Sequence, residues 1–235
     1  MPTQEALFRI VTEKFRAGDG FALATLNLDH LTKLPHDASF LAAYRAHDLV
    51  VADGRPIVWL SELAGEPADL IPGSDLILPL CAAAAKEGVP IALVGSSDDA
   101  LAGAADALKA ATPGLQVAYT HAPAYGFDPT GPAADALLHA LDASGAGLCF
   151  IALGAPKQEI FAARGREKAP GVGFASIGAG LDFLSGHQVR APRIMRQLAL
   201  EWMWRALQSP RRMVPRYAKC FAILPGLYVQ AWRHR

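Results

Sequence analysis

The sequence predicts an α/β fold, with a mostly parallel, Rossmann-like sheet covered by helices on both faces and a C-terminal helical appendage. Six short apolar runs alternate with Ala-, Leu- and charge-rich stretches of helical character. Most of these runs are apolar on both faces, as in strands of a parallel sheet that is covered on both sides. After Gly186 the strand signals stop, and the remaining residues have the composition of helices.

The six apolar runs give the expected strands in chain order. They are residues 21–28, 49–52, 90–95, 115–119, 148–154 and 172–178. Stretches such as 97–111 and 132–143 are the expected connecting helices, because strand–helix–strand alternation favours parallel pairing. We therefore expect an α/β catalytic domain over residues 1–187 and an appendage over residues 188–235. The appendage is expected to contain two or three helices broken at its prolines, Pro192, Pro210, Pro215 and Pro225.

The composition is that of a folded domain, and the cysteines favour a reducing compartment. Of the 235 residues, 52% are hydrophobic and 19% are charged, which argues against a disordered chain. Cys81, Cys149 and Cys220 have neither metal-ligand spacing nor a disulfide framework. We see no secretory signal, and no run reaches the roughly 18 apolar residues of a spanning helix. We therefore expect a cytoplasmic protein.

The zero net charge hides a division between the body and the tail. Residues 186–235 contain ten Lys or Arg and one acid, Glu201, whereas residues 1–185 contain 12 Lys or Arg and 21 Asp or Glu. Three tryptophans lie among the tail cations, a mixture typical of helices that lie on an anionic membrane surface. The alternative is a helical cap on the sheet with solvated arginines. No recognised nucleic-acid-binding module occurs, so we expect no nucleic acid as a partner.

Polar or glycine-rich segments follow five of the predicted strands. Ligands of open α/β sheets bind at the carboxyl ends of strands, and glycines before helix N-termini favour phosphate groups. The expected nucleotide contacts are Gly95, Gly154, Gly178 and Gly180. Asp53 follows an apolar strand and precedes a glycine. Its carboxylate, ionised at neutral pH, is either a proton acceptor for a sugar hydroxyl or the N-cap of the next helix.

The sequence contains no pattern typical of a metal site, a hydrolase or a complete dinucleotide site. The histidines have no ligand spacing, and the metal-holding Asp-x-Asp of many glycosyltransferases does not occur. Gly-x-Ser-x-Gly is absent, which argues against a nucleophile elbow. Gly178-Ala179-Gly180 lacks the third glycine of a dinucleotide fingerprint, because Phe183 takes its place. We expect no metal and no cofactor, so Lys, Arg and backbone N–H groups would neutralise a bound diphosphate.

Several sequence blocks occur in a specific order. They are TLNLDHL at 25–31, ADGRPIVW at 52–59, IPGSDL at 71–76, LGAPKQE at 153–159 and the long run from IGAGLDFL to RRMVPRY at 177–217. Through these blocks the chain resembles the WecG/TagA/CpsF family of bacterial glycosyltransferases (glycosyltransferase family 26). The resemblance implies an inverting, metal-independent transfer from a UDP-sugar to a polyprenyl-diphosphate-linked sugar. The implied products are cell-surface polysaccharides such as teichoic acid, capsule or exopolysaccharide.

The resemblance also implies roles for individual residues. Asp53 corresponds to the proposed catalytic base, and Thr25 and Asn27 correspond to residues that line the pocket. Gln158 corresponds to a substrate contact, and we expect Lys157 beside it to bind substrate as well. The arginines expected to face the diphosphate are Arg190, Arg193 and Arg205, with Arg212 and Arg216 as further candidates.

One position departs from the family pattern. Many members carry Glu-Arg where this chain has Asp69-Leu70, so an arginine expected to neutralise phosphate is missing. Either an appendage arginine replaces it, or the donor or the acceptor differs. Two alternatives from other classes are a non-catalytic, membrane-associated adaptor of a polysaccharide assembly complex and an NAD(P)-dependent oxidoreductase. The expected location is the inner face of the cell membrane, as a peripheral protein, and the apolar appendage helices also suit a homo-oligomer interface.

Overall fold

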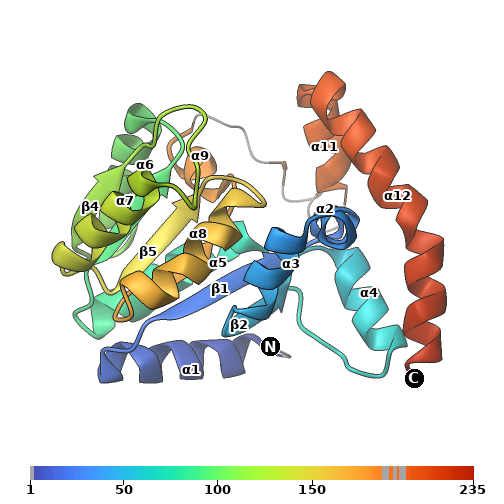
Figure 1. Cartoon of the computed structure of the whole chain (residues 1–235), viewed down its shortest axis with the longest axis horizontal. Helices are drawn as coiled ribbons and strands as arrows, with labels where there is room; N and C mark the ends of the chain where they lie inside the picture. The colour runs from blue at the N-terminus through green and yellow to red at the C-terminus, as the bar shows by residue number, and fades with distance from the viewer. Residues whose placement is uncertain (1–2, 187–190, 193–194, 196–199) are drawn as a thin grey trace.

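A computed structural model of the chain describes residues 3–186, 191–192, 195 and 200–235 (Figure 1). The described residues form a six-stranded sheet in which every neighbouring pair is parallel, in the order β2-β1-β6-β5-β3-β4. The strands are β1 Phe21–Leu26, β2 Leu49–Ala52, β3 Ile91–Gly95, β4 Val117–His121, β5 Leu148–Ala152 and β6 Gly173–Ser176. Each predicted apolar run contains or overlaps one of these strands, which confirms the fold class.

Helices cover both faces of this sheet (Figure 1). Apolar side chains of α1, α5 and α6 share one core cluster with the sheet, and those of α7 and α8 share another on the opposite face. The helices of the body are α1 Gln4–Ala17, α2 Leu28–Lys33, the 3-10 helix η1 Leu34–His36, α3 Ala38–Arg45, α4 Arg55–Leu63, α5 Gly73–Lys86, α6 Asp98–Ala111, α7 Pro132–Ala143, α8 Lys157–Lys168 and α9 Gly180–Leu184.

The strands form because their side chains are apolar on both faces. In β1, Phe21 and Leu23 belong to one core cluster and Ala22 to the other, and all three are fully buried. In β5, Phe150 belongs to the first cluster and Ile151 to the second. Each buried Phe, Leu or Ile stabilises the fold by roughly 1.5–3 kcal/mol relative to an exposed position. The two-sided burial fixes the sheet as the central layer.

Side-chain caps fix where several helices begin. Thr3, Asn27, Asp37 and Ser97 each accept a hydrogen bond from the backbone N–H three residues further on. Such a cap satisfies one of the N–H groups that a helix leaves unpaired at its start. Asn27 directly follows β1 and Ser97 lies two residues after β3, so these caps also set the course of the chain at the carboxyl edge of the sheet.

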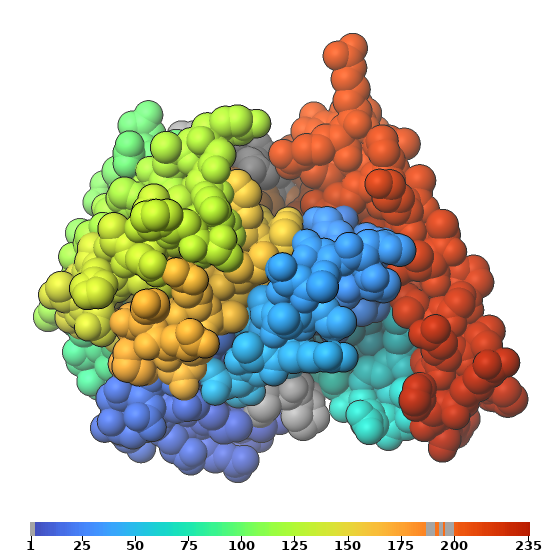
Figure 2. Space-filling model, viewed as in Figure 1, coloured from blue at the N-terminus to red at the C-terminus, as the bar shows by residue number. Residues whose placement is uncertain are grey.

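The described part of the appendage consists of α11 Glu201–Gln208 and the long α12 Pro210–Arg233. Helix α12 lies against α2, α4 and α11. Figure 2 shows the appendage as a continuous ridge along one side of the body. Among the described residues, no helix is both long and apolar enough to cross a membrane.

The expectation that proline breaks the appendage helices at Pro215 and Pro225 is wrong, because α12 runs through both residues. A proline inside a helix removes one hydrogen bond and displaces the carbonyl group four residues earlier. Here these carbonyls belong to Arg211 and Phe221, and all four residues are exposed. Water therefore has access to the groups that the prolines leave unpaired. Pro210 lies in the first turn, where proline is compatible with a helix.

Two helical glycines give a matched test of the packing between α8 and β6. A Cβ atom at Gly165 of α8 would lie 2.4 Å from Cζ of the buried Phe174, whereas a Cβ atom at Gly226 of α12 would meet nothing within 4 Å. We predict that Gly165→Ala lowers the free energy of unfolding by roughly 1–3 kcal/mol through overpacking. Gly226→Ala should raise it by up to about 1 kcal/mol through helix propensity. Urea unfolding checks both, and equal effects would contradict the packing described.

Candidate active site

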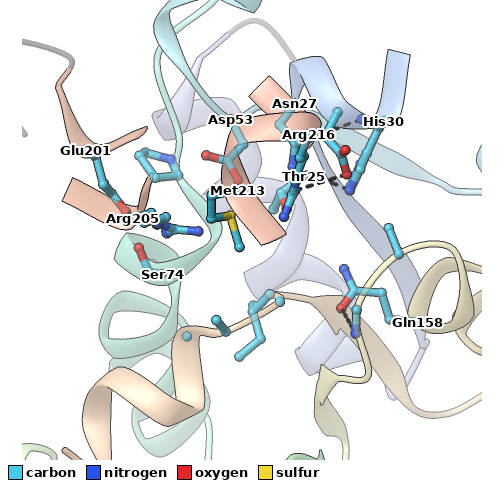
Figure 3. Close-up of a pocket in the computed structure, with 18 of the residues that line it drawn as sticks. Thr25, Asn27, His30, Asp53, Ser74, Gln158, Glu201, Arg205, Met213 and Arg216 are labelled. Atoms are coloured by element: carbon cyan, nitrogen blue, oxygen red, sulfur yellow. Dashed lines mark hydrogen bonds and ion pairs between the residues drawn. The ribbon is translucent and has the colours of Figure 1, made fainter. Parts of the chain in front are cut away.

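A cavity of about 420 Å³ lies between the carboxyl edge of the sheet and the appendage (Figure 3). Because β2, β1, β6 and β5 are neighbours, the residues that follow them converge on this one cavity. The appendage closes it with side chains of α11 and α12 that include Glu201, Arg205, Arg212, Met213 and Arg216.

The structure brings most of the predicted site residues together. Those that line the cavity are Thr25, Asn27, Asp53, Gln158, Gly154, Gly178, Gly180, Arg205, Arg212 and Arg216. Gly95 and Lys157 are not among the lining residues. Arg190 and Arg193 lie outside the described residues.

Gly95 and Lys157 have other surroundings. A Cβ atom at Gly95 would lie 2.5 Å from the backbone of Ala152, so close packing of β3 against β5 requires glycine there. Lys157 begins α8, and its charge acts on Asp128, a residue outside the cavity whose pKa is lowered mainly by hydrogen bonds from Thr130 and to a smaller extent by Lys157. Consecutive helical residues project about 100° apart. Gln158 therefore faces the cavity while Lys157 does not.

Backbone contacts hold Asp53 at the end of β2. Its N–H donates a hydrogen bond to the carbonyl oxygen of Leu26 at 2.7 Å, which extends the pairing of β1 with β2 by one residue. Helix α4 begins at Arg55, and its N-cap is Gly54, so no side chain caps this helix. Of the two roles predicted for Asp53, that of N-cap is therefore wrong. Its carboxyl group points into the cavity instead (Figure 3).

Burial raises the pKa of Asp53 to about 7. Asp53 is only half-buried when the whole residue is considered. Its carboxyl group is nevertheless surrounded by enough protein to destabilise the charged form. Arg205 and the backbone N–H of Gly73 lower the pKa, whereas Glu201 and Asp75 raise it. The expectation of a fully ionised carboxylate at neutral pH is therefore corrected. Near pH 7 the protonated and the ionised forms of Asp53 coexist.

Thr25 and Asn27 form part of the cavity wall next to Asp53. Thr25 is buried, and its hydroxyl donates a hydrogen bond to the carbonyl oxygen of Ser176 in β6 at 3.1 Å. Asn27 accepts a hydrogen bond from the backbone N–H of His30 at 3.1 Å, so its amide nitrogen is the end that faces the His30 ring, 3.4 Å from Nε2. Both side chains are held by the protein before any ligand binds.

His30 also lines the cavity and continues this network. Burial lowers the pKa of His30 to about 3, so the imidazole is neutral at physiological pH. Its Nε2 accepts from the amide of Asn27, which leaves the proton on Nδ1 to face the hydroxyl oxygen of Tyr44. The neutral ring therefore adds no charge to the cavity and instead fixes the orientation of its neighbours.

Gln158 is held at both ends of its amide. Its Oε1 accepts a hydrogen bond from the backbone N–H of Gly154 at 3.2 Å, and its Nε2 donates to Oε1 of Glu159 at 2.8 Å. Only 2% of Gln158 is exposed, and it lines the cavity. One N–H and one lone pair of the amide remain for a ligand.

Ion pairs place the appendage arginines at the cavity. Arg205 lies 2.5 Å from Oε1 of Glu201 and 5.4 Å from the centre of the Phe183 ring. Arg216 of α12 lies 3.0 Å from Oδ2 of Asp29 in α2, and the same oxygen lies 2.7 Å from Nζ of Lys33. Burial opposes ionisation of Asp29, but the two cations outweigh it and lower its pKa. The appendage and the body thus share charged groups at the site.

Sequence reasoning missed Asp29, Lys33, Ser74 and Glu201, which all line the cavity. Asp29 and Lys33 are four residues apart on one helix, a spacing typical of a salt bridge. Glu201 is the single acid of the basic tail, and that isolation was a signal that it has a specific partner. The described residues contain no group of three or more His, Cys, Asp or Glu side chains that would hold a metal ion.

The architecture is that of a Rossmann-like protein with a polar, cation-rich cavity at the carboxyl edge of its sheet, as in enzymes that bind anionic ligands. The family model described as "Glycosyl transferase WecG/TagA/CpsF family" matches residues 1–235, the whole chain. The chain therefore belongs to this family of glycosyltransferases of cell-surface polysaccharide synthesis. As a glycosyltransferase, it requires a sugar donor and an acceptor.

The charges around Asp53 give a prediction for its titration. In the wild-type protein we expect the carboxyl carbon of Asp53 to titrate with a midpoint near pH 7. Glu201→Gln should lower the midpoint, because Glu201 raises the pKa, and Arg205→Gln should raise it, because Arg205 lowers the pKa. Carboxyl ¹³C NMR measures all three midpoints. A wild-type midpoint near the ordinary aspartate value, or shifts of the opposite sign, would contradict the described surroundings.

Proposed function

We propose that this protein transfers a sugar from a UDP-sugar to a polyprenyl-diphosphate-linked sugar, with inversion and without a metal ion, in bacterial cell-surface polysaccharide synthesis. One observation carries the proposal. A carboxyl group with a pKa near 7, Asp53, points into a cavity that Arg205, Arg212 and Arg216 close. A general base acts best when its pKa is near the working pH. The same cavity thus combines a base with cations suited to a diphosphate.

In the proposed reaction, Asp53 removes the proton of the acceptor hydroxyl as its oxygen attacks the anomeric carbon of the donor. The bond between that carbon and the diphosphate oxygen breaks at the same time, and UDP leaves from the opposite face. The configuration at the anomeric carbon therefore inverts. The proton remains on Asp53 until solvent removes it, which a pKa near 7 allows at neutral pH.

The leaving diphosphate would be stabilised by cations that line the cavity. Arg205 and Arg216 are paired with Glu201 and Asp29, so they would share their donors with a ligand. Arg212 has no ion-pair partner among the residues that the structure describes, and it is exposed at the cavity. Hydrogen-bond donors beside the leaving group lower a barrier where negative charge develops.

The position of the missing family arginine supports this role for the appendage. Leu70 packs with Ala52, Ile57 and Val58 in a small apolar cluster beside the end of β2, so position 70 itself supplies no cation. The family arginine missing at Leu70 was explained either by an appendage arginine or by a different donor or acceptor. We favour an appendage arginine as the replacement, and Arg212 is the candidate.

The appendage also has a surface that suits a membrane. Its exposed apolar side chains are Trp202, Met203, Leu207, Val214, Phe221, Tyr228, Val229 and Trp232. Exposed cations of α12 that do not line the cavity lie among them, namely Arg211, Lys219 and Arg233. Helices with apolar side chains and several cations bind anionic bilayer surfaces. We propose that the appendage holds the enzyme on the inner face of the cell membrane, where its lipid-linked acceptor lies.

The proposed transfer can be followed as release of UDP. With a panel of UDP-sugars and a short-chain polyprenyl-diphosphate-sugar, the wild-type protein should release UDP from one donor only when the acceptor is present. Asp53→Asn should lower this rate by about 10²- to 10⁴-fold, because a general base contributes that much. Asp106→Asn, a change of the same kind at an exposed position of α6, should keep the wild-type rate.

Two outcomes would contradict the mechanism. Asp53→Asn with a near-normal rate would remove Asp53 as the base, and loss of activity on adding EDTA would contradict a metal-independent reaction. Wild-type protein that is folded but releases no UDP from any donor would favour the non-catalytic adaptor.

Membrane binding by the appendage should depend on the exposed cations of α12. Removing two cations with Lys219→Gln and Arg233→Gln should weaken binding to vesicles that contain phosphatidylglycerol by roughly 30-fold, at about 1 kcal/mol for each charge. Arg45→Gln with Lys109→Gln removes two exposed cations of the body and should leave binding unchanged. Vesicle co-sedimentation measures both pairs. Equal binding of all variants, or equal binding to pure phosphatidylcholine vesicles, would contradict an electrostatic membrane contact through α12.

A further inference from the structure

Glu159 lies directly behind the cavity wall and does not line the cavity. It follows Gln158 in the first turn of α8, and its side chain is 0% exposed. Its Oε1 accepts the hydrogen bond from Nε2 of Gln158. Its Oε2 is buried and has no hydrogen-bond partner among the described residues. A carboxyl group thus occupies a position where half of its polar atoms have no partner.

The stability of the fold does not explain this residue. A buried polar atom without a hydrogen bond destabilises the folded state, and a buried carboxylate does so more strongly. Burial accordingly raises the pKa of Glu159 to about 7. An apolar side chain of similar length would avoid both effects. A polar residue here supplies the contact with Gln158, while its own backbone N–H and the charge of Lys33 also favour its ionised form.

That contact decides between two orientations of the Gln158 amide. In the observed orientation, Oε1 faces the N–H of Gly154 and Nε2 faces the carboxyl oxygen of Glu159. After a 180° rotation of the amide, two donors would face each other at Gly154 and two acceptors would face each other at Glu159. The ionised carboxylate only accepts hydrogen bonds, so it excludes the rotated form, and the N–H of Gly154, which only donates, disfavours that form whether or not Glu159 is protonated. Glu159 and Gly154 together leave the amide one orientation.

We propose that Glu159 is a positioning residue, which holds the Gln158 amide in the orientation that presents its free N–H and its free lone pair to the sugar substrate. The proposal rests on the proposed function, because it takes Gln158 as a substrate contact. Glu159 touches no substrate itself. Its effect passes through one hydrogen bond, and it concerns which polar atoms of Gln158 face the cavity (Figure 3).

The test compares two substitutions of Glu159. Glu159→Met removes the acceptor and the unpartnered oxygen together. It should lower kcat/KM by roughly 10- to 100-fold, as misplaced substrate contacts do, without lowering Tm. Glu159→Gln keeps an oxygen that can accept from Gln158, and the N–H of Gly154 still selects the amide orientation, so most of the activity should remain. Glu167→Met, the same change at an exposed position of α8, is the matched control and should leave activity and Tm unchanged.

The pH dependence of Tm separates positioning from a structural role. Folding raises the pKa of Glu159 from 4.5 to about 7, so the wild-type protein loses stability as the pH rises through this range. Glu159→Met lacks this loss, and its Tm relative to wild type should be higher at pH 8 than at pH 5. A structural residue would give the opposite result, namely a lower Tm at both pH values together with an unchanged kcat/KM per folded molecule. That outcome would overturn the proposal.

A double-mutant cycle and an activity-independent measurement complete the test. If Glu159 acts through Gln158, Glu159→Met should have little further effect in a Gln158→Ala background. In ¹⁵N NMR spectra, the side-chain NH₂ signals of Gln158, assigned by their loss in Gln158→Ala, should exchange slowly with solvent in wild type and in Glu159→Gln. They should exchange faster in Glu159→Met. Unchanged exchange in Glu159→Met would overturn the proposal even if no donor is turned over. Normal exchange behaviour with no transferase activity would instead contradict the proposed function alone.

Discussion

The site depends on the parallel pairing of β1 with β2 on one side and with β6 on the other. In this register Leu26 lies opposite Ala52, and Ala24 lies opposite Ser176. Neighbouring strands lie about 4.8 Å apart, so residues that follow their carboxyl ends are within reach of one ligand. The bridge between Ala52 and Leu70 then carries the chain back beside β2. Helix α5 follows at Gly73, whose N–H lowers the pKa of Asp53.

The division of charge along the chain has a local counterpart in the cavity. Arg205 is paired with Glu201 within the appendage, whereas Arg216 is paired with Asp29 of the body. Asp29 is almost fully buried and also contacts Lys33, so removing either cation would leave a buried carboxylate less compensated. The contact that holds α12 on α2 is therefore also part of the electrostatics of the site. The outward cations of α12 remain for other partners.

Much of the fold was predictable because strands that are apolar on both faces leave a clear pattern in the sequence. The loops that form the site were predictable for the same reason, since parallel strands place their carboxyl ends on one edge. The direction in which individual side chains point was not predictable from the sequence. Lys157 and Gln158 are adjacent in sequence, but helix geometry turns only Gln158 to the cavity. Gly95 was predicted to contact phosphate, but a glycine is required there because the backbone of Ala152 lies too close for a side chain.

The pKa of Asp53 and the course of α12 were not predictable, because both depend on surroundings that the sequence does not specify. The protein groups around Asp53 come from β2, α5 and the appendage, which are far apart in sequence. A proline inside a helix can kink it without ending it, and in α12 both prolines lie on a side of the helix that faces away from the body. Prediction failed where the outcome depends on tertiary burial.

Burial of titratable groups gives the cavity its net charge. His30 is neutral because its pKa is about 3, and Asp53 is partly protonated near pH 7. The cations Lys33, Arg205, Arg212 and Arg216 all line the cavity. The acids that line it are Asp29, Asp53 and Glu201. Positive charge therefore exceeds negative charge before a ligand binds, and an anionic ligand would be attracted.

On the proposed function, this balance links donor binding to the base. A bound diphosphate would raise the pKa of Asp53, as any added negative charge does, and would so favour the protonated form that cannot accept a proton. The arginines oppose that effect, because a cation beside Asp53 favours its ionised form. Arg205 already lowers the pKa of Asp53 without a ligand. The appendage would therefore do two things at once, neutralising the leaving group and keeping the base ionised, which explains why one cavity wall supplies so many cations.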